Sequence, residues 1–320
     1  MKNNEINPQN IIGFFSDSHG LNEILFANLD AGIAAGIDKF YNAGDTTPKS
    51  PKGALIKDEL FDGGIASECR AVSKGLEANP ELVKQFLTDS LNSVSDLANV
   101  LGAKYSKVIK AMISGNAEVI VSEYMKKVGM NDTIISLLED KIDFKTTPFV
   151  HVYNNGQLYQ SGISGVDACV LGLPHLKTSC VEEIAYGIKN GTDDTAAAKK
   201  ILEKQMSIIK AVNPSTIIQV QHEHPREECS VAVGTKKAVN NPEIYEMAMD
   251  FVTNLIKDSN YKTQNYTILY GHVGQKKRVQ HNLDVNGVIV PTIHINEGTE
   301  MLYANTKNGQ VLPEGTFMPK

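Results

Sequence analysis

Short runs of β-branched and aromatic residues alternate along the chain with longer amphipathic stretches. Runs of the first kind are typical of strands, and apolar positions that recur about every three to four residues are typical of helices. Alternation of the two kinds predicts an α/β fold. The short runs predict strands at Ile11–Phe15, Lys39–Asn42, Val108–Ile113, Pro148–Tyr153, Thr216–Val220, Tyr266–Tyr270 and Val288–Ile295.

Helical spacing predicts further elements between these strands. The stretches Thr195–Val212 and Asn241–Ile256 carry the apolar period of helices and precede the strands that begin at residues 216 and 266. A helix directly after the first strand is predicted by apolar residues that would share one of its faces: Leu21, Ile24, Leu25, Leu29 and Ile33.

Two Asn-Gly pairs occur between predicted strands, at Asn155-Gly156 and at Asn308-Gly309. Both residue types tolerate the left-handed backbone of tight hairpin turns, so each pair predicts a hairpin. The second pair would join a strand over Met301–Asn305 to a short strand over Gln310–Leu312.

The stretch of residues 49–107 has little strand signal and lies between strands that otherwise look like neighbours. We interpret it as a helical insertion that could form a cap over a functional site. Its helical character follows from the spacing of its apolar residues: Leu82, Val83, Phe86, Leu87, Leu91, Val94 and Leu97.

The composition is that of an ordinary globular protein, with 320 residues, 42% of them hydrophobic and 21% charged. We expect one domain over residues 10–320 that contains the helical insertion. The net charge of −6 disfavours nucleic acid as the main partner, because such binding needs a basic surface. It is compatible with a small phosphorylated substrate, whose charge a bound metal ion can offset.

Four cysteines, Cys69, Cys169, Cys180 and Cys229, lie far apart and form no Cys-x-x-Cys pair. We expect reduced thiols and a cytoplasmic location. The polar start MKNNEINPQN lacks the apolar core of a signal peptide, and no apolar run reaches the roughly 20 residues of a membrane span. No membrane association is therefore predicted, and the sequence predicts no oligomeric state.

The polar residues that could bind a metal or catalyse a reaction are concentrated where predicted strands end. In each case an apolar strand is followed at once by Asp, Asn or His, and in open α/β sheets ligands bind outside the carboxyl ends of the strands. The five segments are Ser16-Asp17-Ser18-His19, Ala43-Gly44-Asp45, Ser114-Gly115-Asn116, Gln221-His222-Glu223-His224 and Gly271-His272.

Carboxylate, amide and imidazole groups at one crevice suit Mn²⁺, Fe or Zn²⁺. Asp17 and His19 are two residues apart in extended backbone, so both side chains can point the same way. The glycines before Asp45, Asn116 and His272 allow tight turns there. Each segment alone has a simpler interpretation, a helix cap at Asp17 or a loop turn at the Gly-Asp and Gly-Asn pairs. Their joint order favours a metal site.

This order, Asp-x-His, Gly-Asp, Gly-Asn, His and Gly-His, resembles the motif series of the calcineurin-like metallophosphoesterases. It spans about residues 13 to 272, and the later stretch Asn296-Glu297-Gly298-Thr299 is similar to one that often follows in that family. The resemblance implies a four-layer α/β/β/α sandwich with two divalent metal ions. By the same resemblance Asp17 and His19 would bind the first ion, Asp45 would bridge both, and Asn116, His222 and His272 would bind the second.

Two positions depart from the family pattern. Ala117, followed by Glu118, stands where the family usually has a histidine that assists the leaving group, and Gly274 stands where it has a last metal ligand. His224 and His175 are the histidines that we expect to substitute as catalytic groups. Loss of a general acid typically costs about 10² to 10⁴ in rate, so slower turnover is expected.

The resemblance implies a metal-dependent hydrolase of phosphoesters in which metal-activated water is the nucleophile. Because the histidine is missing at Ala117, diesters with good leaving groups are favoured over monoesters. The alternative is a weakened member of the family that keeps the fold as a binding or scaffold module. Metal content distinguishes them, since an enzyme should bind close to two ions per chain.

Overall fold

A computed structural model describes residues 6–18, 23–47, 80–159, 166–176, 195–232, 242–272, 278–295, 301–313 and 316–317. The helices in this part are the short 3₁₀ helix Pro8–Asn10, α1 (Glu23–Ala34), α3 (Pro80–Val100), the π turn Leu101–Tyr105, α4 (Asn116–Lys127), α5 (Ile134–Lys141), α7 (Thr195–Val212), α8 (Glu227–Ala232) and α9 (Pro242–Lys257). The strands are β1 (Ile11–Phe15), β2 (Phe40–Asn42), β3 (Ile109–Ile113), β4 (Phe144–Lys145), β5 (Phe149–Asn154), β6 (Gln157–Tyr159), β7 (Ala168–Leu173), β8 (Thr216–Gln221), β9 (Asn265–Tyr270), β10 (Gln280–Val285), β11 (Val288–His294) and β12 (Leu302–Asn305).

The predicted strands and helices are confirmed, with ends that differ by a residue or two, and the protein has a mixed α/β fold. The apolar face predicted for α1 is confirmed only in part, because Leu25 and Leu29 are buried whereas Ile24 and Ile33 are 53% and 37% exposed. Asn155 and Gly156 have positive φ angles of 49° and 74° and join β5 to β6 as a hairpin. Beyond β12, the predicted short strand is a single bridge between Ala304 and Val311. Strands β4, β7 and β10 and helices α4, α5 and α8 were not predicted from the sequence.

The strands form two sheets. The five-stranded sheet has the order β12-β1-β2-β3-β4, with β1 to β4 parallel and β12 antiparallel at one edge. The seven-stranded sheet has the order β10-β11-β9-β8-β7-β5-β6, and its middle strands β11, β9, β8 and β7 are parallel. Parallel strands end at the same edge of a sheet, so each sheet collects the polar segments that follow its strands.

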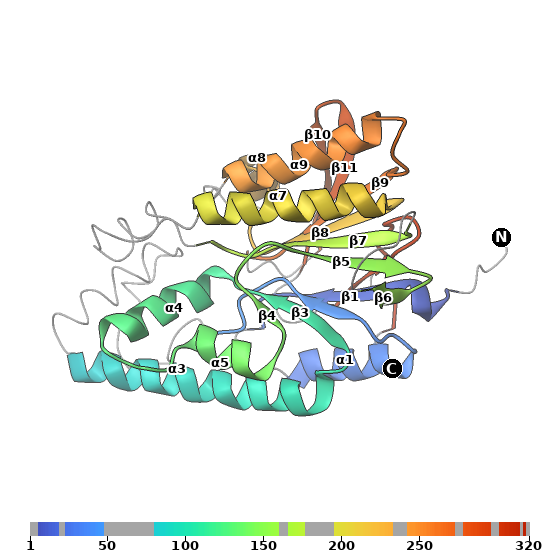
Figure 1. Cartoon of the computed structure of the whole chain (residues 1–320). Helices are drawn as coiled ribbons and strands as arrows, with labels where there is room; N and C mark the ends of the chain where they lie inside the picture. The colour runs from blue at the N-terminus through green and yellow to red at the C-terminus, as the bar shows by residue number, and fades with distance from the viewer. Residues whose placement is uncertain are drawn as a thin grey trace.

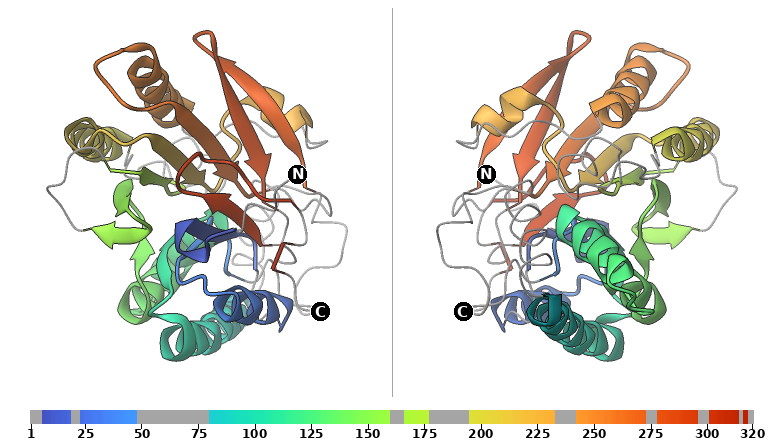
Figure 2. Two further views of the ribbon diagram at one scale, coloured as in Figure 1. Left: turned by 90° about the vertical axis from the view of Figure 1, so that its right-hand side faces the viewer. Right: turned by 90° about the vertical axis from the view of Figure 1, so that its left-hand side faces the viewer.

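Helices cover the outward face of each sheet, and the two sheets face each other (Figure 1). Apolar residues of α1, α3 and α5 pack with β1, β2 and β3 in one cluster, and those of α7 and α9 pack with β7, β8 and β9 in a second. A third cluster lies between the sheets and includes Phe14, Tyr41, Val170 and Ile218. Figure 2 shows α7 and α9 on one side of the strands and α1 and α3 on the other.

Helix α3 is the described part of the predicted insertion, together with the π turn that follows it. Its residues Leu87, Val94 and Leu97 are buried in the same cluster as Ile11 and Phe40. This helix is therefore part of the layer that covers the five-stranded sheet. Residues 48–79 lie outside the described part, and a cap formed by them stays a prediction.

A small polar network lies between the sheets. The hydroxyl of Tyr41 lies 2.8 Å from His151 Nδ1 and 2.6 Å from the hydroxyl of Tyr153. Burial lowers the pKa of His151 to about 4, partly opposed by the charge of Asp143. The imidazole is therefore neutral at pH 7, and protonating it favours the unfolded chain, where its pKa is near 6.5.

We expect this histidine to make the fold sensitive to mild acid. Since its pKa is lower in the folded state, its contribution is fully present above pH 6.5 and is lost as the pH falls toward 4. Between pH 7 and pH 5 the loss should be roughly 1 to 2 kcal/mol. Urea unfolding of the wild type and of His151→Gln at both pH values, with EDTA present, measures it. A wild-type loss no larger than that of the variant would contradict the expectation.

Candidate metal centre

The polar segments of both sheets meet where their strands end. Asp17 N donates to Gly44 O at 2.9 Å within the five-stranded sheet, and Gly271 N donates to His222 O at 2.9 Å within the seven-stranded sheet. Contacts that join the two sheets include the hydrogen bond from His272 N to Asp17 Oδ2 at 3.1 Å and the contact of His222 Nδ1 with the Ala43 carbonyl at 2.8 Å. The site is thus shared between both sheets.

His222 Nε2 is the centre of the cluster. It lies 2.8 Å from Asn116 Oδ1, 3.3 Å from Asp45 Oδ1 and 3.1 Å from His272 Nδ1. All four side chains are buried, with His222 fully so. Asp45, His222 and His272 offer ligand atoms within 4.8 Å of one another, which is close enough for a single metal ion.

The donor atoms fit a divalent cation. Atoms that share one ion at about 2.1 Å lie roughly 3 to 3.5 Å apart, similar to the separations around His222 Nε2. The Ala43 carbonyl can only accept a hydrogen bond, so His222 Nδ1 carries the proton, which leaves Nε2 for a metal. One carboxylate, one amide and two imidazoles form a donor set that suits Mn²⁺, Fe or Zn²⁺.

Without a cation the site is electrostatically negative. Burial alone would lower the pKa of His222, but the carboxylates of Asp45, Asp17 and Glu223 outweigh it and raise this pKa to about 10. The surrounding carboxylates therefore favour a positive charge at His222, and a bound metal ion would supply such a charge.

Three candidate ligands have left-handed backbone, which is uncommon outside glycine. The φ angles are 51° at Asp17, 55° at Asp45 and 73° at His272. Such conformations cost of order 1 to 3 kcal/mol each and cluster at functional sites.

The glycines beside these residues are needed for close approach. A Cβ on Gly115 would overlap the Asp45 carboxylate, and one on Gly271 would overlap the Ser16 hydroxyl. The glycines before Asn116 and His272 were predicted to allow tight turns, and this close packing is a second reason for them.

Glu118 ties two of the segments together. Its fully buried carboxylate accepts hydrogen bonds from Asp45 N at 3.1 Å and from Gly115 N at 2.7 Å. It also accepts from Thr46 Oγ1 at 3.0 Å and from Thr47 N at 2.7 Å. One carboxylate thereby fixes the loop after β2 against the loop after β3, and with them Asp45 and Asn116.

Two further histidines flank the cluster. The His175 ring lies edge-on to His222 with centroids 6.4 Å apart, and its Nδ1 lies 2.7 Å from Glu223 Oε1. The His224 ring is stacked beside His272 at 6.3 Å. Both histidines were predicted near the site, and the structure brings both to it.

Two features of the site were not predicted from the sequence, the contact of His175 with Glu223 and a buried chain of amides on β8. The amide of Gln221 donates to the Glu223 carbonyl at 2.6 Å, and the amide of Gln219 donates in turn to Gln221. Both glutamines are fully buried. The signal that could have revealed them is the alternation of Gln219 and Gln221 with apolar residues in a strand that is buried on both faces.

The predicted site residues therefore come together as far as the structure describes them. Asn116, Asp45, His222 and His272 share one point, and Asp17 lies beside His272 through its contact with the backbone. His19 and Gly274 lie outside the described residues.

The fold and the site define a mixed α/β protein with a candidate site for a divalent metal ion. No family model and no curated protein match the sequence. Solved structures similar to the chain include GAP50, the anchor in the inner membrane complex of Plasmodium, at 11% identity and a TM-score of 0.39, covering 97% of this chain and 89% of that one. Another is the Thermus thermophilus sulfate thiohydrolase SoxB, at 12% identity and a TM-score of 0.38, covering 89% of this chain and 39% of that one. Similarity at this level assigns neither a family nor an activity.

Within the described residues, no helix combines the length and apolar character that crossing a membrane requires. Cys169 and Cys229 are buried free thiols, and Cys69 and Cys180 lie outside the described part.

Proposed function

We propose that the protein is a metal-dependent hydrolase of phosphoesters with the four-layer sandwich of the calcineurin-like metallophosphoesterases. The observation that carries the proposal is the meeting of Asp45, Asn116 and His272 around His222 Nε2. The order of the motifs supports the family. The three apolar clusters, one between the sheets and one on each outer face, support the sandwich.

The proposal assigns a role to each group. Asn116, His222 and His272 would hold one divalent ion, Asp17 and His19 a second, and Asp45 would contact both. When bound, such ions polarise a phosphoryl oxygen and lower the pKa of water. Ala43 orients the His222 ring through Nδ1, and Glu118 holds the loops that present Asp45 and Asn116.

The proposed substrate is a small phosphodiester with a good leaving group. Ala117 offers no proton to a departing oxygen, so a leaving group that needs little help is favoured. His175 and His224 flank the cluster and are the groups that we propose as substitutes. The buried free thiols fit the reducing cytoplasm, where we place the enzyme.

Metal content and turnover together test the proposal. Protein stripped with EDTA and reloaded with Mn²⁺ is analysed for bound metal and assayed with bis(p-nitrophenyl) phosphate and p-nitrophenyl phosphate. We expect close to two ions per chain and faster turnover of the diester. The bound ions and the turnover should both be lost with EDTA and return with Mn²⁺.

Other outcomes separate the alternatives. One bound ion without turnover would favour a binding or scaffold module. That alternative is supported by Ala117 and Gly274, which stand where the family usually has histidines. Failure to bind Mn²⁺, Fe²⁺ or Zn²⁺ at all would contradict the metal site itself.

A further inference from the structure

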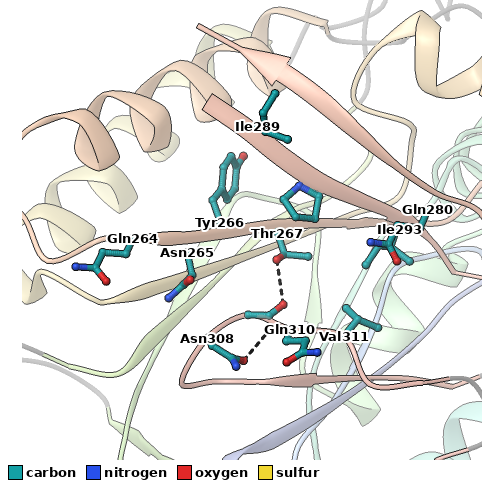
Figure 3. Close-up of a pocket in the computed structure, with 12 residues that line it drawn as sticks. Gln264, Asn265, Tyr266, Thr267, Gln280, Ile289, Ile293, Asn308, Gln310 and Val311 are labelled. Atoms are coloured by element: carbon teal, nitrogen blue, oxygen red, sulfur yellow. Dashed lines mark hydrogen bonds between the residues drawn. The ribbon is translucent and has the colours of Figure 1, made fainter. Parts of the chain in front are cut away.

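A groove of about 490 Å³ lies outside the candidate metal centre. It is lined by the start of β9, by β11, by Gln280 of β10 and by the turn around Gly309. The groove runs from Gln264 at the start of β9 to Ile293, which pairs with Leu269 near the end of that strand, and its lining includes none of the candidate metal ligands. Figure 3 shows the turn with Asn308 and Gln310 opposite Asn265 and Thr267.

The walls of the groove are held in place by hydrogen bonds. Thr267 Oγ1 donates to Gly309 O at 3.0 Å, which fixes the turn against β9. Within the turn, Gln310 N donates to Asn308 Oδ1 at 3.0 Å. Thr216 Oγ1 donates to Lys307 O at 3.1 Å and fixes the start of the turn to β8. The groove is therefore a built feature shared by three strands and a turn.

Uncharged amides dominate the polar part of the lining. Carboxamide side chains come from Gln264, Asn265, Gln280, Asn308 and Gln310, and all of these except Asn265 are exposed to solvent. Each carboxamide offers two N–H donors and an acceptor oxygen. A ligand hydroxyl group can therefore both accept a hydrogen bond from it and donate one to it. None of the described residues that line the groove carries a charge, so an ionic ligand would find no counterion.

Apolar surface accompanies the amides. The aliphatic part of the lining consists of Ile289, Pro291, Ile293 and Val311, and Ile289 of β11 is 61% exposed. A sugar ring has hydroxyl groups at its edge and a face of C–H groups, so it matches amides and aliphatic side chains together. The volume suits one or two rings, since small-molecule sites usually measure about 300 to 1,000 Å³.

We propose that this groove is a second binding site, for a neutral saccharide recognised by the amides of Gln264, Gln280 and Gln310. It is independent of the metal centre and of phosphoester hydrolysis. Binding should be weak, with a Kd of about 1 mM, because exposed amides give up water to bind a hydroxyl group.

Saturation-transfer NMR tests the groove with the whole chain. The probes are maltose, cellobiose and diacetylchitobiose, with adenosine and an uncharged alanine peptide as the other arms. We expect at least one disaccharide to bind, and Gln310→Ala and Gln264→Ala each to weaken it about 2- to 10-fold. Gln205→Ala, on α7, is the matched control and should leave the Kd unchanged.

EDTA should also leave saccharide binding unchanged. Failure of the saccharide proposal can therefore be distinguished from failure of the proposed metal-dependent hydrolysis. No disaccharide binding at about 20 mM would overturn the proposal. Binding that both groove variants leave unchanged would overturn it as well, as would a stronger response to adenosine or to the peptide.

Discussion

Asp45→Asn is expected to reduce metal-dependent turnover by about 1000-fold or more, as measured with bis(p-nitrophenyl) phosphate. The change removes one charge from the cluster, and charge stabilisation by a metal centre is worth several kcal/mol, with about 1.4 kcal/mol per tenfold change. Asparagine tolerates the left-handed backbone of this position, where φ is 55°. Its amide oxygen can still accept the hydrogen bond that Ala117 N donates at 3.0 Å, so the fold should survive.

Metal analysis accompanies this assay, because the loss should appear first as fewer bound Mn²⁺ ions per chain. Asp132→Asn is the matched control, since Asp132 is exposed and lies away from the cluster. Full turnover by Asp45→Asn, or equal losses in both variants, would contradict the role proposed for Asp45.

Glu118→Ala is expected to destabilise the fold by about 3 to 5 kcal/mol. Its carboxylate is fully buried and accepts four hydrogen bonds, three of them from backbone N–H groups. Alanine would leave these donors without an acceptor, at about 1 to 3 kcal/mol for a buried group. Thermal unfolding in EDTA should show a fall in Tm of roughly 5 to 10 °C, and the Mn²⁺ affinity should weaken with it.

Glu139→Ala serves as the control, because Glu139 is exposed on α5 and should cost less than about 0.5 kcal/mol. If Glu118→Ala does not fold, Glu118→Gln keeps one acceptor oxygen and should give an intermediate Tm. Unchanged Tm and Mn²⁺ affinity in the glutamine variant would contradict the proposed role.

Much of this fold could be predicted because its strands are short apolar runs with polar residues at their ends. Strand β7 was missed although Ala168–Leu173 is such a run, because the run could equally belong to a buried helix. Once β7 is placed parallel to β8, His175 comes to the same edge as His222. Strand β10 was missed although Asn286-Gly287, with φ angles of 54° and 77°, marks its hairpin with β11.

The candidate ligands could be predicted because each follows directly after a strand. The groups that hold them could not. Glu118 lies inside a helix, and only the three-dimensional packing shows that its carboxylate reaches Asp45 N and Thr47 N, more than 70 residues earlier. The pairing of His175 with Glu223 depends on the parallel registry of two strands, which no local pattern encodes.

Because the donor atoms come from both sheets, a bound cation would hold the two sheets together across their interface. Asp45 and Asn116 follow strands of one sheet, and His222 and His272 follow strands of the other. A ligand that binds only when both halves are docked stabilises that docking by mass action. Loading with metal would then slow any separation of the halves, and hydrogen exchange at the buried amides of β2 and β8 would record it.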